Sequence, residues 1–355
     1  MGSSKNSLER PVGKEDLVKY VGIDLHKRDL VVAVEEDSGP VGKAVRIACE
    51  DEGVIIALFE KLRPFKAVIE ASASYRWLYD LLEPMGTVVL AHPLRLRAIV
   101  TSRAKTDKLD AAILAKLLRL GEIPAAYVPP RPFQDLRDLT RARGRLTQQG
   151  TAAKCQMHVV LRRVNAHSPY RNVFCQRGRR WLGRLDLGVA GNLVRDELLL
   201  RLEHYARAAA KVDAYLAKVA EEFPEVESLT ELYGIGLYSA LLLVAELGEV
   251  ERFRNDRQVG AYAGLTARVH QSGGHDYHGN ITHQGSSWLR WILVQAGMKL
   301  IRRDVALRNF YTRIRKRAGK KIARVAVARK LAGICWIRLR RWHREHRLAQ
   351  NAAGN

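Results

Sequence analysis

Apolar segments of strand length alternate with helical segments along the first third of the chain. Residues 19–24 and 29–35 are two strand-like segments separated by a short polar turn, which predicts a β-hairpin. Further strands are expected at 43–48, 66–70 and 87–90, and helices at 51–62 and 74–84. Strands mixed with helices in this order predict an α/β domain, which we expect to cover residues 17–128.

Carboxylates lie at the ends of two of these strands and at the start of a later helix. Asp24 and Glu70 each end a strand-like segment. Asp107 and Asp110 follow Thr106, a favourable N-cap, and leave the same face of the first helical turn. Taken alone, this pair is explained equally well by the preference of acids for helix N-termini. If all four acids converge, their hard oxygen atoms suit Mg²⁺ or Mn²⁺ and not zinc.

The excess of positive charge points to a polyanionic partner. The chain has 60 Lys and Arg against 37 Asp and Glu, and a formal net charge of +23. Nucleic acid is favoured over a membrane surface as the partner. Between residues 302 and 347 there are 17 Lys and Arg against two acids, which favours contacts with a phosphate backbone. The densest run provides five residues expected to bind nucleic acid: Arg315, Lys316, Arg317, Lys320 and Lys321.

Membrane insertion and a disulfide framework are both disfavoured by the sequence. No apolar run approaches the ~20 residues of a membrane span. The four cysteines are far apart and form no CxxC pair, which is typical of a protein kept reduced in the cytoplasm.

The middle of the chain, residues 129–226, is predicted to be a linker followed by a helical coiled coil. Residues 129–132 are proline-rich, and two long helical segments are expected at 135–164 and 193–223. Two long helices around a loop favour an antiparallel hairpin that could pair with another subunit. The basic and aromatic stretch 171–184 between them is interpreted as a nucleic-acid surface of low specificity.

The last part of the chain carries a glycine turn and a serine in a glycine-rich segment. Gly234 and Gly236 precede a helix at 238–247, as in a helix-hairpin-helix that presents backbone amides to a phosphate, although a tight apolar turn is the alternative. Residues 267–285 are expected to form a loop that contains Ser272. The same loop contains four histidines, His270, His275, His278 and His283. Contacts of these histidines with phosphate or bases are favoured over a zinc site.

Several of these motifs resemble those of the IS110 family of insertion-sequence transposases. The segments around Asp24, Glu70 and 105–111 resemble its D-E-D-D set. Residues 259–266 (Val-Gly-Ala-Tyr-Ala-Gly-Leu-Thr) resemble its A-G-L-T region, and the Ser-Gly that follows at Ser272 resembles its nucleophilic serine. The next family motif is matched at Gly285, Leu289 and Arg290, whereas Thr282 and His283 depart from its serine and lysine.

The resemblance implies a specific domain organisation and set of site residues. It implies a RuvC-like (RNase H-like) domain at 17–128, a coiled coil at 129–226 used for assembly and RNA contact, and a mostly α-helical, serine-bearing transposase domain at 227–345. A disordered N-terminus (1–16) and a tail (346–355) would flank them. The implied catalytic and nucleic-acid-binding residues are Asp24, Glu70, Asp107 and Asp110 holding Mg²⁺, Ser272 as nucleophile, and Lys105 and Arg290 as further contacts to nucleic acid.

The function implied by the resemblance is that of an RNA-guided DNA recombinase. A noncoding bridge RNA would select donor and target DNA, and Ser272 would form a 5′-phosphoserine intermediate. Acids and serine would come from different protomers of a dimer that assembles to a tetramer, in a bacterial or archaeal cytoplasm at the nucleoid. Two alternatives remain open: a guide-independent metal nuclease like a junction resolvase, and a non-catalytic nucleic-acid-binding protein.

Overall fold

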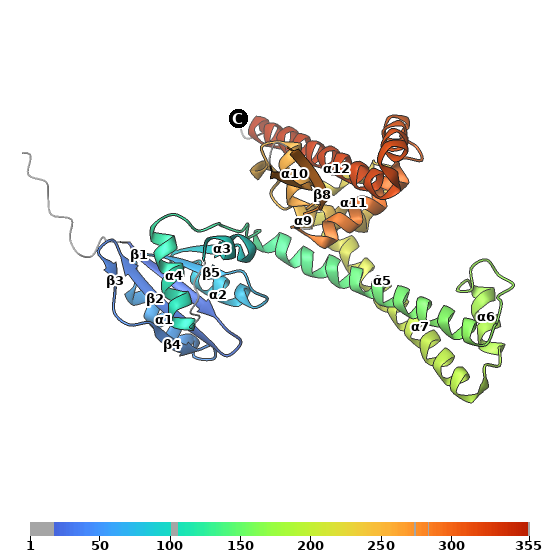
Figure 1. Ribbon diagram of the computed structural model, residues 1–355, viewed down its shortest axis with the longest axis horizontal. Helices are drawn as coiled ribbons and strands as arrows, with labels where there is room; N and C mark the ends of the chain where they lie inside the picture. The colour runs from blue at the N-terminus through green and yellow to red at the C-terminus, as the bar shows by residue number, and fades with distance from the viewer. Residues whose placement is uncertain (1–17, 101–105, 273–274, 283, 354–355) are drawn as a thin grey trace, which may run out of the picture. The chain divides into compact units, whose positions relative to one another are not determined.

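The computed structural model describes residues 18–100, 106–272, 275–282 and 284–353. The chain divides into two compact units, residues 1–128 and 129–355, and each is described by itself (Figure 1). The N-terminal segment expected to be disordered, residues 1–16, lies outside the described residues, as does Lys105.

The first unit is built on one mixed sheet with the strand order β3-β2-β1-β5-β6, in which β4 also pairs with β2. Its strands are β1 (Lys19–Leu25), β2 (Asp29–Glu36), β3 (Gly39–Pro40), β4 (Val45–Ala48), β5 (Phe65–Glu70) and β6 (Thr87–Ala91). Strand β1 runs antiparallel to β2 and parallel to β5, and β5 runs parallel to β6. The expected hairpin and the later strands are therefore present.

Helices cover both faces of this sheet (Figure 1). On one face, α1 (Glu52–Lys61) and α2 (Tyr75–Leu82) bury Phe59 and Leu78 against side chains of β1. On the other face, α3 (Pro93–Ile99) and α4 (Asp107–Arg119) pack against the sheet through side chains such as Leu96 and Leu114. The predicted α/β character is confirmed, and the layers are consistent with an RNase H-like domain. The short helix α3 was not predicted.

A long helical hairpin begins the second unit. Helices α5 (Arg131–Arg163) and α7 (Gly188–Val219) lie side by side, and the shorter α6 (Gln176–Arg184) lies between them in the chain (Figure 1). They run antiparallel, because Arg143 contacts Asp213 at 2.8 Å whereas Gly150, farther along α5, faces Tyr205, earlier on α7.

The start of α5 corrects one sequence prediction. Residues 129–132 were expected to be a linker, but the helix already begins at Arg131. Pro132 lies in the first turn, where a proline costs no hydrogen bond because the amides there have no partner within the helix.

The rest of the second unit is mostly helical and is centred on α9. Its helices are α8 (Val226–Thr230), α9 (Leu237–Leu247), α10 (Asp256–Tyr262), α11 (Ser287–Leu300) and α12 (Val305–Ala353), with 3₁₀ turns η1 (Ala220–Glu222) and η2 (Val250–Arg252). Every residue from Ala240 to Leu247 is buried. Helix α12 is interrupted at Gly319, whose φ is +83°, and it continues through most of the expected tail (346–355). In the described part of the chain, no helix is both long and apolar enough to cross a membrane.

The segment expected to be a loop, residues 267–285, is largely a second, two-stranded sheet. Strands β7 (Ala267–Ser272) and β8 (His275–Ile281) pair antiparallel. The sequence does contain a hairpin signal here, since Gly273 and Gly274 separate two segments of strand length. The prediction of a loop was wrong because this pattern was interpreted as glycine-rich flexibility.

Candidate active site

Three of the four predicted acids line one cavity of about 190 Å³ in the first unit: Asp24, Glu70 and Asp110. Asp24 and Glu70 lie near the same ends of the parallel neighbours β1 and β5, where Ile23 pairs with Ile69. Ligands collect at the carboxyl ends of such strands. Asp110 reaches the cavity from the first turn of α4, which packs on β1. The fold therefore joins acids that are up to 86 residues apart in the chain.

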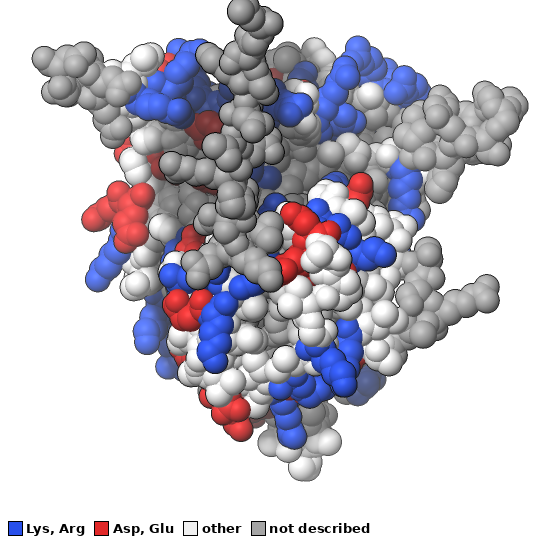
Figure 2. All heavy atoms as spheres, turned by 90° about the vertical axis from the view of Figure 1, so that its left-hand side faces the viewer, with Lys and Arg blue, Asp and Glu red and all other residues white. Residues whose placement is uncertain are grey.

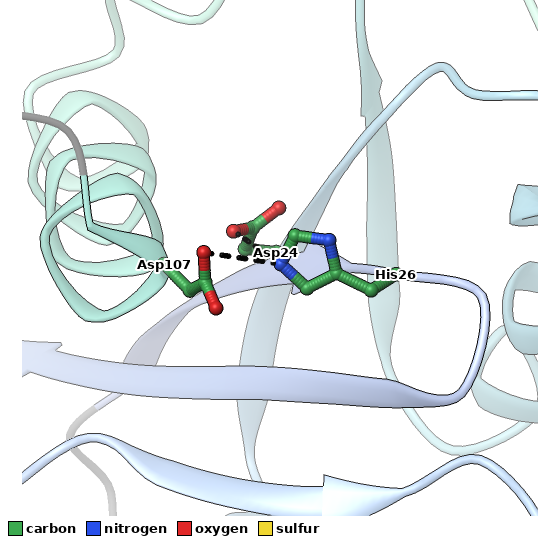
Figure 3. Close-up of side chains that lie close together, drawn as sticks. All are labelled: Asp24, His26 and Asp107. Atoms are coloured by element: carbon green, nitrogen blue, oxygen red, sulfur yellow. Dashed lines mark ion pairs between the residues drawn. The ribbon is translucent and has the colours of Figure 1, made fainter.

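The fourth acid, Asp107, is linked to Asp24 through a histidine. The three side chains point toward one another from the end of β1, the turn after it and the start of α4 (Figure 3). His26 Nε2 lies 3.1 Å from Oδ2 of Asp24 and 3.4 Å from Oδ1 of Asp107. Thr106 caps α4 as expected, because its Oγ1 accepts a hydrogen bond of 3.3 Å from the N–H of Leu109.

The two linked aspartates differ in their electrostatic surroundings. Burial raises the pKa of Asp24, His26 opposes this, and the nearby carboxylates Asp110 and Asp107 raise the pKa further. A hydrogen bond from Arg46 lowers the pKa of Asp107. Arg46, on β4, forms ion pairs with both Asp29 and Asp107. The positive charge of Arg46 therefore compensates Asp107, while Asp24 is left among other acids.

This arrangement fits a hard divalent cation. Asp24, Glu70 and Asp110 line one cavity, and the pKa of Asp24 is raised first by burial and then by the nearby carboxylates Asp110 and Asp107, whose negative charge a cation would compensate. Asp24, His26 and Asp107 also bring one ligand atom each within 4.8 Å of one another, which gives a second group of potential ligands that shares Asp24.

Sequence reasoning missed His26 and Arg46. His26 lies only two residues after Asp24, but the segment was interpreted as a simple turn. Arg46 is 61 residues from Asp107, and no local pattern connects the two. A basic residue on an edge strand gives no signal of which carboxylate it will meet.

The second unit carries the predicted serine in a strand. Ser272 is the last residue of β7, and its backbone pairs with His275 of β8. The backbones of His270 and His278 belong to the same two strands, whereas His283 lies outside the described residues.

Arg290 was predicted to bind nucleic acid, and the structure gives its guanidinium a different set of partners. Nη1 donates to the carbonyl oxygens of Gly285 at 2.9 Å and of Ala263 at 3.3 Å, and burial lowers the pKa of Arg290. These carbonyls flank the β7–β8 hairpin on its two sides, and the N–H of Thr282 donates to Thr266 O at 2.9 Å between them. Arg290 thus holds together the base of the hairpin whose first strand, β7, ends at Ser272.

The other residues predicted to bind nucleic acid are spread over the second unit. Gly236 is the exposed N-cap of α9, and Gly234, with φ of +91°, packs against Lys299. Five cations flank the interruption of α12, and all are exposed: Arg315, Lys316, Arg317, Lys320 and Lys321. Within the described residues, none of these five forms an ion pair with an acid.

Positive charge is strongly unequal between the two units. Residues 129–355 contain 41 Lys and Arg against 19 Asp and Glu, a net charge of +22, whereas residues 1–128 contain 19 against 18. On the face drawn in Figure 2, Lys and Arg side chains are mixed with Asp and Glu side chains instead of forming one uniform patch. The excess of positive charge that predicts a polyanionic partner therefore lies in the second unit.

Comparisons with known proteins agree along most of the chain. A family model of DEDD transposases of IS110, described as a transposase, matches residues 21–166. A second model, described as the transposase IS116/IS110/IS902 family, matches residues 226–312. The transposase for insertion sequence element IS1111A of Coxiella burnetii is 25% identical, over 91% of this chain and 90% of its own length. The transposase for insertion sequence element IS1328 of Yersinia enterocolitica is 26% identical, over 90% and 96%. A "Probable family 20 transposase" of Pseudomonas aeruginosa is 28% identical, over 80% and 86%.

Proposed function

Since this chain belongs to the IS110 family of DEDD transposases, we propose that it is an RNA-guided DNA recombinase that joins donor and target DNA for an insertion sequence. The observation that carries the proposal is the convergence of Asp24, Glu70 and Asp110 on one cavity, with Asp107 linked to Asp24 through His26. A set of acids of this kind can hold the metal ions that catalyse the cleavage of phosphodiester bonds.

Mg²⁺ or Mn²⁺ would be held by Asp24, Glu70 and Asp110. Asp107 would join them as a ligand after its ion pair with Arg46 is broken. The bound ion would compensate negative charge at the scissile phosphate. The protein side chains have their own tasks. The carboxylates fix the position of the phosphate-binding centre on two strand ends and one helix start. His26, whose Nε2 lies 3.1 Å from Asp24 and 3.4 Å from Asp107, would help to position the oxygens of these two acids.

Ser272 would supply the nucleophile. Its Oγ forms a bond to phosphorus while the bond from phosphorus to the 3′ oxygen breaks, and the serine proton ends on the released 3′-hydroxyl. The 5′-phosphate remains on serine, so the phosphodiester bond is conserved. Attack by the 3′-hydroxyl of the other DNA strand then reverses the step and joins the strands. As the family resemblance implies, the acids of one protomer and Ser272 of another would form the site in a dimer or tetramer.

The second unit would bind the nucleic acids. Its net charge of +22 suits donor and target DNA together with a noncoding guide RNA. The turn at Gly234 and Gly236 would act as a helix-hairpin-helix, with the N-terminal amides of α9 against a phosphate. Backbone contacts of this kind provide affinity but little sequence choice, so base pairing to the guide would select the sites.

The test is a covalent adduct assay with the full chain, its guide RNA and end-labelled DNA carrying the element's ends. The wild-type protein should form a protein–DNA adduct with a free 3′-hydroxyl, and Ser272→Ala should form none. Ser287→Ala, which removes an exposed serine from α11, should behave as wild type.

An alternative outcome would identify a guide-independent metal nuclease. In that case Ser272→Ala would still cut DNA, no adduct would form, and water would be the nucleophile. Asp110→Asn should abolish cleavage under either mechanism, so only the serine variant separates the two.

A further inference from the structure

A cavity of about 1020 Å³ in the second unit has no role in the chemistry described so far. It lies between the base of the β7–β8 hairpin, the start of α10 and the two parts of α12 on either side of Gly319. All of these elements belong to one compact unit.

The walls of the cavity are largely apolar and partly open to solvent. Leu265 and Ile281 line it from the hairpin side, and Phe310, Ile322 and Val325 line it from α12. Ile322 is 57% exposed, although it is a large apolar residue in the middle of the chain's most basic segment. An apolar wall exposed in this way indicates a binding surface.

Three cations surround the apolar walls. Lys321, Arg329 and Lys330 line the same cavity, and all three are exposed. Lys330 Nζ lies 5.0 Å from the centre of the Phe310 ring. Asp256, at the start of α10, also lines the cavity and can accept a hydrogen bond from an exocyclic amine. An apolar surface for a base, cations for its phosphate and an acceptor for its edge match the chemistry of a nucleotide.

The cavity is close to the proposed nucleophile along the chain. Ala267 lines it and begins β7, and Ser272 ends the same strand five residues later. At ~3.4 Å per residue this is ~17 Å. One strand of B-form DNA advances ~3.4 Å per nucleotide, so the cavity is about five nucleotides from Ser272. A DNA strand positioned for attack by Ser272 therefore has nucleotides within reach of the cavity.

We propose that this cavity binds one unpaired nucleotide of a DNA strand, a few nucleotides away from the phosphate that Ser272 attacks. The proposal rests on the proposed function for the choice of DNA. Base stacking on Phe310 and Ile322, with phosphate bound by the three cations, would offset the loss of pairing and stacking in the duplex. The cavity would thereby fix the position of the strand relative to the β7–β8 hairpin.

The experiment uses the full chain and two short DNA duplexes that each carry one 2-aminopurine, bulged in one duplex and paired with thymine in the other. Fluorescence of the 2-aminopurine reports binding of each duplex, and titration gives the two Kd values. We expect the wild-type protein to bind the bulged duplex about tenfold more tightly than the paired duplex, and Ile322→Glu to remove this preference. Ile337→Glu is the matched control, because Ile337 is 56% exposed on α12, lies outside the cavity and undergoes the same change of charge.

Three results would overturn the proposal. The first is that both variants lose the preference equally. The second is that the wild type binds bulged and paired DNA equally well. The third is that the wild type binds the same bulge more tightly in an RNA duplex than in a DNA duplex. Ser272→Ala separates this proposal from the proposed function, because that variant should keep the full preference for the bulge. If the adduct assay fails while the preference still depends on Ile322, the nucleophile is wrong and the cavity assignment stands.

Discussion

Gly22 of β1 lies so close to α4 that a Cβ atom at this position would be 2.0 Å from the carbonyl oxygen of Ala111. The same atom would lie 2.4 Å from the backbone nitrogen of Ala115. Helix α4 can therefore pack directly on the backbone of β1, two residues before Asp24. This close approach brings Asp110 to the cavity that Asp24 and Glu70 line. The glycine is a condition for the geometry of the acids.

Gly22→Ala is expected to separate α4 from β1 and to weaken metal binding. Neither the strand nor the helix backbone can yield locally, so the cost should be at least ~1–3 kcal/mol of unfolding free energy. We expect a lower Tm and at least a tenfold weaker affinity for Mn²⁺ in calorimetric titration. Gly53→Ala in α1 is the control, because nothing lies within 4 Å of the added carbon and the substitution favours helix. Equal Mn²⁺ affinity in wild type and Gly22→Ala would contradict this role of the glycine.

Asp24→Asn should stabilise the metal-free protein at neutral pH and abolish stabilisation by Mg²⁺. The folded-state pKa of Asp24 is raised by burial and by Asp110 and Asp107. When the pKa of an aspartate is raised in the folded state, the folded protein loses stability as the pH rises through that pKa. At neutral pH the ionised Asp24 therefore lowers the free energy of unfolding, and asparagine removes this effect. The gain should be about 2–4 °C in Tm per kcal/mol of repulsion removed. Thermal unfolding with and without Mg²⁺ measures both effects, and a Tm increment from Mg²⁺ that persists in Asp24→Asn would rule out this carboxylate as a ligand.

The same raised pKa predicts how metal binding depends on pH. Mg²⁺ competes with a proton for Asp24, so the Tm increment from Mg²⁺ should fall as pH is lowered. Because the pKa lies above the ordinary value of 3.8, the loss should begin at a higher pH than for a solvated aspartate. Titration of the increment between pH 7 and pH 4 checks this. A midpoint at or below 3.8 would mean that burial and the neighbouring acids do not raise the pKa of Asp24 in solution.

The sequence predicted the first unit well because its signals are local. The strands that end at Asp24 and Glu70 follow apolar runs, and Thr106 marks the start of α4, so the acids could be assigned to element ends. The contacts that tune them are not local. Arg46 meets Asp107 only because β4 joins the sheet edge on the side where α4 begins, and that depends on packing.

In the second unit the local structure around Ser272 was predicted wrongly, although a family resemblance had singled out the residue. Ser272 was identified by resemblance within a segment interpreted as a loop, and it ends a strand instead. Arg290 was assigned to nucleic-acid binding through its match to a family motif, whereas in the structure its Nη1 donates to carbonyl oxygens at the base of the hairpin. A match to a motif identifies the residue but does not give the partners of its side chain.

Arg290→Lys should therefore impair the reaction without weakening DNA binding. Lysine keeps the positive charge but cannot reproduce the planar guanidinium that reaches both Gly285 O and Ala263 O. We expect Kd for duplex DNA within about threefold of wild type, and formation of the Ser272 adduct reduced at least tenfold. Arg315→Lys, at an exposed position on α12, should change neither quantity. A parallel loss of DNA affinity and adduct formation in Arg290→Lys would instead make Arg290 a nucleic-acid contact.

Arg141→Met should strongly destabilise the second unit at the joint between α5 and α9. Arg141 donates to both carboxylate oxygens of Glu246 at 2.7 and 2.9 Å, and the Glu246 side chain is only 1% exposed. Removing the arginine leaves a buried, uncompensated carboxylate, which costs about 3–5 kcal/mol. Urea unfolding followed by tryptophan fluorescence measures this, because five of the six tryptophans lie in this unit.

The control is Arg145→Met, at an exposed position of α5, whose free energy of unfolding should stay within ~0.5 kcal/mol of wild type. The double variant Arg141→Met/Glu246→Leu should recover most of the lost stability, and failure to recover it would show that the arginine acts through packing and not through the ion pair.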